Sequence, residues 1–177
     1  MAPGFIVLYS FYMHEKIHLL GKGLETSEPY VVYVDIAIHL AKLMLKIEPQ
    51  QTISLCDNII KKSSALSIID NKYNVNILIA KSYKSFALIL TDDYEQAQTL
   101  AESVYVAVTN NERLIEQRII LLITFAYFNL HVLDFQKAMN YLENALIFAK
   151  SNDDNFSLIS VYCAFARTFG ESKDYQN

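Results

Sequence analysis

Two histidines near the N-terminus are the residues of this sequence best suited to catalysis. The segment His14-Glu15-Lys16-Ile17-His18 follows the pattern H-E-x-x-H. On a helix, this spacing places two imidazoles one turn apart, where they could bind Zn²⁺, with Glu15 beside them as a general base. The chemistry of such a site would be zinc-dependent hydrolysis.

The surroundings of these histidines argue against a zinc site. Catalytic zinc needs a third protein ligand, and Leu24 stands where the extended motif carries a third histidine. Lys16 places a positive charge between the two imidazoles, and the short preceding segment leaves no room for a sheet beside the helix. We therefore expect two solvated histidines on a surface helix, with no metal and no cofactor. A zinc hydrolase using His14, Glu15 and His18 remains the alternative.

Composition and charge narrow the class of protein. The 177 residues suit one domain, and a chain with 53% hydrophobic residues, four glycines and three prolines is typical of an ordered, helix-rich fold. The net charge is −4, and Lys and Arg are scattered along the sequence. The clustered basic residues typical of a nucleic-acid-binding protein are therefore missing.

The sequence shows neither a signal peptide nor a membrane-spanning segment. The apolar run Phe5 to Tyr12 is too short to span a membrane and lacks the features of a signal peptide. Cys56 and Cys163 lie far apart within helical patterns, so we expect two buried free thiols in a reducing compartment. The sequence predicts a cytoplasmic protein without a membrane or nucleic-acid partner.

Apolar residues at three- and four-residue spacings predict about eight helices and no strand. The predicted ranges are 5–20, 29–47, 49–67, 73–90, 93–109, 112–131, 134–150 and 155–169. Pro29 and Pro49 suit the first turn of a helix, and Asn111 and the aspartates suit caps. Asp35 and His39, one turn apart, are expected to form a solvated edge pair, with a buried charged pair as the alternative.

One sequence unit recurs along the chain at nearly equal intervals. It appears as Asp93-Tyr94-Glu95-Gln96-Ala97, as Asp134-Phe135-Gln136-Lys137-Ala138 and as Asp174-Tyr175-Gln176. After the first two, slim residues seven positions apart mark a helix face that a neighbouring helix can approach closely, at 97–104 and 138–145. Each unit is therefore expected to be a helical hairpin, with Thr52 in place of the alanine in an earlier one.

This unit resembles the tetratricopeptide repeat, whose second helix opens after an Asp-Tyr pair and carries alanines seven residues apart. The matching residues are Leu122, Phe125, Ala126, Asp134, Phe135, Ala138 and Ala145, followed by Tyr162, Ala166 and Phe169. The resemblance covers residues 72–177, whereas 1–71 keep the hairpin pattern without the signature. The period is longer than is usual for this family, and Lys84 and Asn129 depart from the family pattern.

The resemblance implies an all-α, right-handed solenoid of antiparallel helical hairpins, forming one domain over residues 1–177. Because the last unit is incomplete, we expect a piece of a longer chain; the alternative is that the last helix is itself the cap. Long-period versions are similar to those of bacterial signalling proteins. The implied function is a non-catalytic module that binds a protein or peptide, as a sensory, regulatory or scaffold part of a larger signalling protein.

Aligning the units places a binding groove on one helix of each pair. The expected groove residues are Lys81, Ser82, Lys84, Phe86, Arg118, Tyr127, Asn129 and Arg167, with Leu130 nearby. Their basic and amide groups could bind a carboxylate or a peptide backbone. The alternative is that Lys81, Lys84 and Arg118 solvate an outer face.

The last predicted helix carries apolar residues on more than one face. They are Phe156, Ile159, Tyr162, Cys163, Phe165, Ala166 and Phe169. Exposed apolar faces mark interaction sites, so a homodimer through this C-terminal helix is expected.

Overall fold

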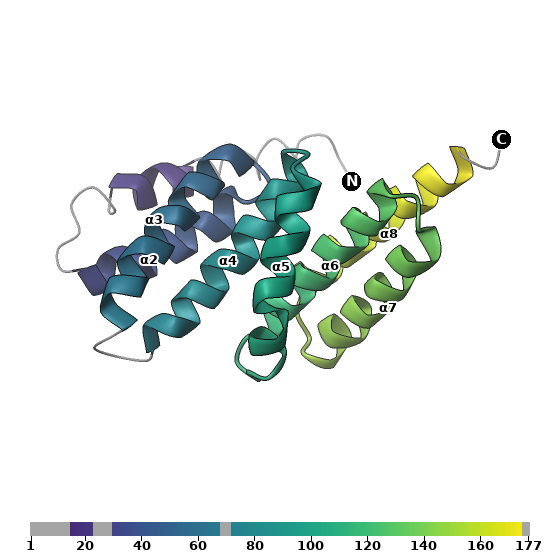
Figure 1. Cartoon of the computed structure of the whole chain (residues 1–177). Helices are drawn as coiled ribbons and strands as arrows, with labels where there is room; N and C mark the ends of the chain where they lie inside the picture. Colours follow the sequence, from purple (N-terminus) through teal and green to yellow (C-terminus); the bar gives the residue numbers. More distant parts are fainter. Residues whose placement is uncertain (1–14, 23–29, 68–71, 175–177) are drawn as a thin grey trace. The chain divides into compact units, whose positions relative to one another are not determined.

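A computed structural model describes residues 15–22, 30–67 and 72–174, and its regular elements in these ranges are all α-helical (Figure 1). Residues 15–22 are helical. The labelled helices are α2 (Tyr30–Met44), α3 (Pro49–Ser67), α4 (Lys72–Leu90), α5 (Tyr94–Thr109), α6 (Ile115–His131), α7 (Phe135–Ser151) and α8 (Asn155–Asp174). The predicted all-helical fold is thus confirmed for the described ranges. None of their helices combines the length and apolarity needed to cross a bilayer.

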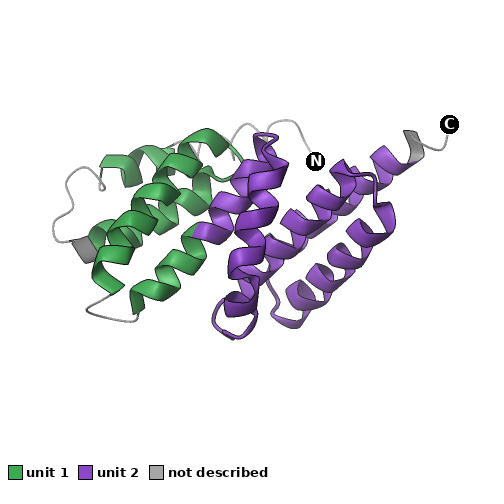
Figure 2. Ribbon diagram, in the orientation of Figure 1, with its two compact units in different colours: residues 1–80 green, residues 81–177 purple. Residues whose placement is uncertain are grey.

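The chain divides into two compact units, residues 1–80 and 81–177, with the boundary inside α4 (Figure 2). The single domain expected over residues 1–177 stays a prediction.

In the first unit, α2 packs against α3. The buried face of α3 consists of residues at helical spacing: Thr52, Leu55, Cys56, Ile59 and Ser63. Thr52 is fully buried, and its hydroxyl donates a hydrogen bond to the carbonyl of Glu48, 3.0 Å away, so the residue just before α3 satisfies this polar side chain. The Lys62 ammonium lies 3.2 Å from the centre of the Tyr33 ring.

In the second unit, each helix from α5 to α8 packs on its neighbour in the chain, and α8 also contacts α6. The buried faces of α5 and α7 correspond position by position when the two Asp-aromatic pairs are aligned. They consist of Ala97, Ala101, Val104 and Val108 in α5, and Ala138, Leu142, Ala145 and Ala149 in α7. The alanines among these residues let neighbouring helices approach closely.

Three turns of the second unit share one geometry. Asp92, Leu133 and Asp153 have φ of 62°, 63° and 51°, the left-handed conformation that ends a helix. The following aspartate then caps the next helix: Asp93, Asp134 and Asp154 accept hydrogen bonds from backbone N–H groups three residues later, at 3.4, 3.0 and 3.1 Å. The Asp-aromatic pairs at 93 and 134 therefore mark helix starts, as predicted.

Leu133 gives a stability prediction, because a leucine at positive φ is strained by roughly 1–2 kcal/mol. Leu133→Gly removes this strain but makes the unfolded chain more flexible, so we expect the free energy of unfolding to rise by about 0.5–1 kcal/mol. Urea denaturation measures the change. Val132→Gly is the matched control: Val132 has φ −88°, so this change should lower stability.

Some predicted boundaries are wrong. Helix α2 ends at Met44 rather than near Ile47, because the residue before Pro49 disfavours helical geometry. Helix α6 begins at Ile115 rather than directly after Asn111, because the Asn111 side chain accepts a hydrogen bond from the Arg113 N–H at 3.1 Å and forms a local turn instead of a helix cap.

Helix α8 is longer than predicted. It runs through Gly170 to Asp174, so Asp174 does not begin a new helix. The ion pair between Arg167 and Glu171, one turn apart at 2.8 Å, spans the predicted end at Phe169 and supports the extra turn.

Candidate functional site

A small polar pocket lies where the start of α5, the end of α6 and α8 meet in the second unit. It has a volume of ≈ 130 Å³. Its lining residues are Tyr94 from α5, Tyr127, Leu130 and His131 from α6, Leu133 from the following turn, and Arg167 and Glu171 from α8. Liganded sites for whole drug-sized molecules are roughly 300–1,000 Å³, so this pocket fits a single functional group.

Arg167 supplies the positive charge of this pocket. Its Nε–H donates to a carboxylate oxygen of Glu171 at 2.8 Å, and its guanidinium carbon lies 5.0 Å from the centre of the Tyr127 ring. Tyr127 in turn stacks on Phe86, with ring centres 6.0 Å apart. The guanidinium is therefore held by an ion pair and by an aromatic face, while its Nε–H is only one of five N–H donors.

Tyr94 and His131 form one wall of the pocket. Their rings are parallel within 5°, with centres 3.8 Å apart, and the Tyr94 hydroxyl donates to Asp92 at 2.9 Å. Thus α5 and α6 supply this wall, whereas α8 supplies the positive charge of Arg167.

The pKa values of the pocket follow from burial and charge. Burial raises the pKa of the Tyr127 hydroxyl, and the nearby Arg167 charge opposes this rise. Burial, followed by the hydrogen bond to Asp92, raises the pKa of Tyr94. The hydrogen bond with Glu171 raises the pKa of Arg167 despite partial burial. At neutral pH the site therefore offers one guanidinium cation and two uncharged phenols.

An acidic depression adjoins the same ring pair. Asp92, Asp93, Tyr94, Glu95 and His131 line it. Asp92 accepts from the Tyr94 hydroxyl, and Asp93 caps α5 while also accepting from the Gln96 side-chain amide at 2.6 Å. Both carboxylates therefore have local hydrogen-bond partners in and next to this turn, which explains why they lie here.

The structure brings together three of the eight expected groove residues. Phe86, Tyr127 and Arg167 form one continuous stack, in which Phe86 is buried. Lys84 instead lines a separate, wider groove with Leu88 and residues of α5, whose volume is ≈ 420 Å³.

The other expected groove residues lie elsewhere. Arg118 donates to the Thr109 carbonyl and stacks on Phe148, 4.5 Å from the ring centre, so it braces the start of α6. Ser82 and Asn129 are buried, and the Asn129 amide donates to the Phe125 carbonyl at 2.7 Å. Lys81 is half-buried on α4.

The predicted groove lacks four residues of this pocket. The sequence pattern places Tyr94 at a helix start, His131 at a helix end and Leu133 in a turn, without a binding role for any of them. Glu171 lies beyond the predicted end of α8, although its four-residue spacing from Arg167 is a usable signal.

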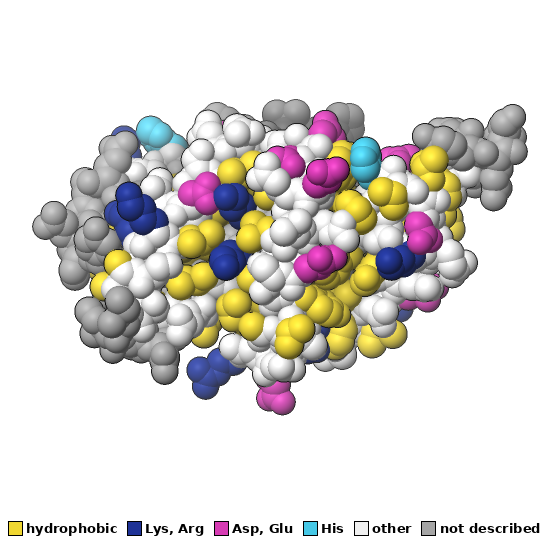
Figure 3. Space-filling model, viewed as in Figure 1, with side chains coloured by type: hydrophobic (Ala, Val, Ile, Leu, Met, Phe, Trp, Pro, Cys, Tyr) yellow, Lys and Arg dark blue, Asp and Glu magenta, His cyan; other side chains and the backbone are white. Residues whose placement is uncertain are grey.

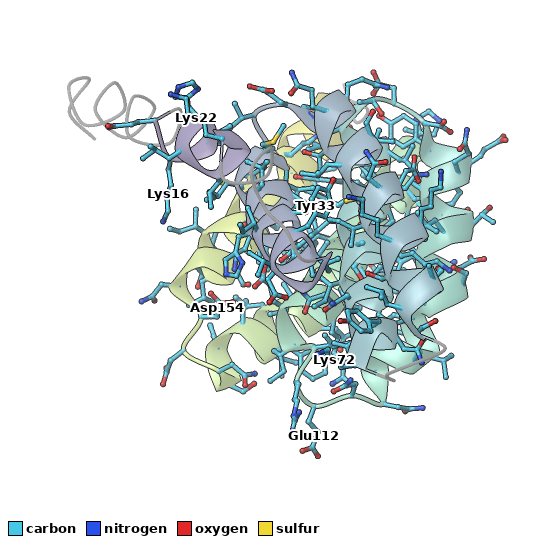
Figure 4. All side chains as sticks on the ribbon, turned by 90° about the vertical axis from the view of Figure 1, so that its left-hand side faces the viewer. Lys16, Lys22, Tyr33, Lys72, Glu112 and Asp154 are labelled. Carbon is cyan, nitrogen blue, oxygen red and sulfur yellow. The ribbon has the colours of Figure 1, made fainter. Side chains whose placement is uncertain are left out.

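The catalytic motif of the N-terminal segment is only partly visible. His14 lies outside the described residues, while Glu15 and His18 are exposed on the helical residues 15–22. Within the described ranges, no three potential ligands cluster closely enough to hold a metal. Figure 4 shows Lys16 at the edge of this helix and Glu112 projecting from the loop before α6.

Other sequence-based expectations have mixed outcomes. Asp35 and His39 are both exposed, as expected, and the His39 Nδ1 lies 2.8 Å from the Asp35 carbonyl oxygen rather than at its carboxylate. Cys56 is a buried free thiol, but Cys163 is exposed, so the prediction of two buried thiols is wrong for Cys163.

On the face shown in Figure 3, basic side chains lie dispersed among hydrophobic and uncharged ones.

Comparisons with protein-family models, with curated proteins and with solved structures gave no match.

Proposed function

We propose that this chain is a non-catalytic, tetratricopeptide-like module of helical hairpins that binds a protein or peptide partner. The supporting observation is the correspondence between α5 and α7, which extends from the left-handed turn residue through the aspartate cap to four buried positions. Such correspondence is typical of stacked hairpins in a solenoid.

Arg167 is the proposed anchor for a carboxylate of the partner. Its terminal N–H groups could bind two carboxylate oxygens, and the flat rings of Tyr127, Tyr94 and His131 flank a space of single-group size. Glu171 opposes this binding because its charge repels an incoming anion and already uses the Nε–H. Removing the charge of Arg167 should therefore weaken carboxylate binding, whereas removing the charge of Glu171 should strengthen it.

The test uses a short alanine peptide with an acetylated N-terminus, either with a free C-terminal carboxylate or amidated. We expect NMR shifts at Tyr94, Tyr127 and Arg167 with the free acid alone. Arg167→Gln should weaken binding by about ten- to a hundredfold, since a charge-assisted hydrogen bond contributes roughly 1.5–3 kcal/mol. Glu171→Gln should strengthen it.

Arg113→Gln is the matched control, because Arg113 is an exposed arginine in the loop before α6 and does not line the pocket. It should leave binding unchanged. Equal shifts with the amidated peptide, or equal losses in the Arg113 and Arg167 variants, would mean that the pocket does not recognise a carboxylate.

A further inference from the structure

His131 borders two neighbouring features of the second unit. It lines both the small pocket that contains Arg167 and the acidic depression beside that pocket. The residue is exposed and occupies the last position of α6. Its ring lies parallel to the ring of Tyr94, with the two centres 3.8 Å apart, so the packing of α6 on α5 determines where a charge on this imidazole would stand.

The charges around His131 are mostly negative. Arg167 attracts a carboxylate, but four carboxylates line the same two features and repel it. They are Glu171 in the pocket, and Asp92, Asp93 and Glu95 in the depression. A further carboxylate, that of Asp134, follows His131 by three residues and caps α7. With a neutral imidazole, a bound carboxylate is therefore held by one cation within a net negative field.

A proton on His131 changes this balance beside the bound group. The imidazolium has two N–H donors, and it lies at the C-terminal end of a helix, next to the partial negative charge of the last carbonyl groups. The face of the Tyr94 ring also attracts a cation, so the stacked arrangement suits the charged ring. The fold therefore provides a place for a second positive charge.

The pH range in which this charge would form leaves the partner's charge intact. Histidine side chains ordinarily gain their proton between about pH 8 and pH 5. Asp, Glu and a peptide's C-terminal carboxylate ordinarily stay ionised down to about pH 5. Mild acidification therefore adds a cation to the site without neutralising the anion that it binds.

We propose that protonation of His131 regulates carboxylate binding in this pocket, so that the module holds its partner more tightly at mildly acidic pH. The inference rests on the carboxylate binding proposed above. Arg167 supplies the paired hydrogen bonds to the carboxylate, and His131 supplies the second positive charge. Because the protonated ring binds the anion better, affinity should rise as pH falls.

The test titrates the acetylated alanine peptide with a free C-terminal carboxylate at about pH 8 and about pH 5.5. For the wild-type chain, we expect Kd to fall by about two- to fivefold at the lower pH, the effect of one partly exposed charge pair. His131→Gln is neutral at both pH values and should bind equally at both. His131→Arg keeps a planar cation that can stack on Tyr94, so at the higher pH it should bind as tightly as the acidified wild type.

His39→Gln is the matched control, because His39 is an exposed histidine of α2 that lines neither feature. It should keep the full pH response of the wild type. Circular dichroism at both pH values should show unchanged helix content in all the variants, so that a change in affinity reports on the pocket.

The outcomes separate this inference from the proposed function. If the wild type binds equally at both pH values while Arg167→Gln still weakens binding, the carboxylate pocket stands and regulation by His131 is wrong. A pH response that persists in His131→Gln would also overturn the inference, since another group would then take up the proton. If the free-acid peptide binds at neither pH, the proposed function and this inference are both wrong.

Discussion

Replacing Ala138 with leucine should lower the free energy of unfolding by about 1–3 kcal/mol. Ala138 is fully buried at the start of α7, in the first turn after the Asp134 cap, where α7 meets α6. The added carbons have no free volume there, so the helices must separate or the side chain must leave its preferred rotamer. Urea denaturation followed by circular dichroism measures the loss.

Ala97 tests whether this effect repeats. It occupies the equivalent position of α5 and is also fully buried. Ala97→Leu should therefore cost a similar amount. Ala107→Leu is the matched control on the same helix, because Ala107 is exposed and leucine is a good helix former. If all three variants were equally stable, the alignment of α5 with α7 would be wrong.

The sequence predicted these buried alanines because spacing alone determines which face of a helix is apolar. The caps at Asp93 and Asp134 were also predictable, since a short acidic side chain before a helix has one dominant local use. Asn111 misled for the same physical reason. Its side chain can cap a helix or close a tight turn, and only the folded chain shows that it closes the turn.

The candidate site was less predictable than the fold. Arg167 and Tyr127 were chosen from their register, but Tyr94 and His131 meet only because α5 packs against α6, which brings the start of one helix next to the end of the other. Arg118 was predicted as a groove residue in the same way as Arg167. Its side chain instead donates to the Thr109 carbonyl and stacks on the Phe148 ring. Long-range partners of this kind leave no periodic trace in a sequence.

Leu142 is a buried position at which α7 carries a larger side chain than α5, because α5 has Ala101 there. Both side chains are fully buried, so the surroundings of α7 have adapted to a larger group. Leu142→Ala should therefore lower the free energy of unfolding by about 2–5 kcal/mol, through lost apolar burial and the cavity that remains. The neighbours on this face, Ala145 and Ala149, are too short to fill the gap, which favours the upper half of this range.

Ile147→Ala provides the control within the same helix. Ile147 is 63% exposed, so its truncation should change stability by less than about 0.5 kcal/mol. A further check is Leu142→Met, which keeps the volume and should cost less than about 1.5 kcal/mol. A loss below about 1 kcal/mol for Leu142→Ala would indicate that α6 and α8 collapse onto α7. In that case the distance between α7 and its neighbours would be the short one that Ala101 allows in α5. Leu142 would not determine it.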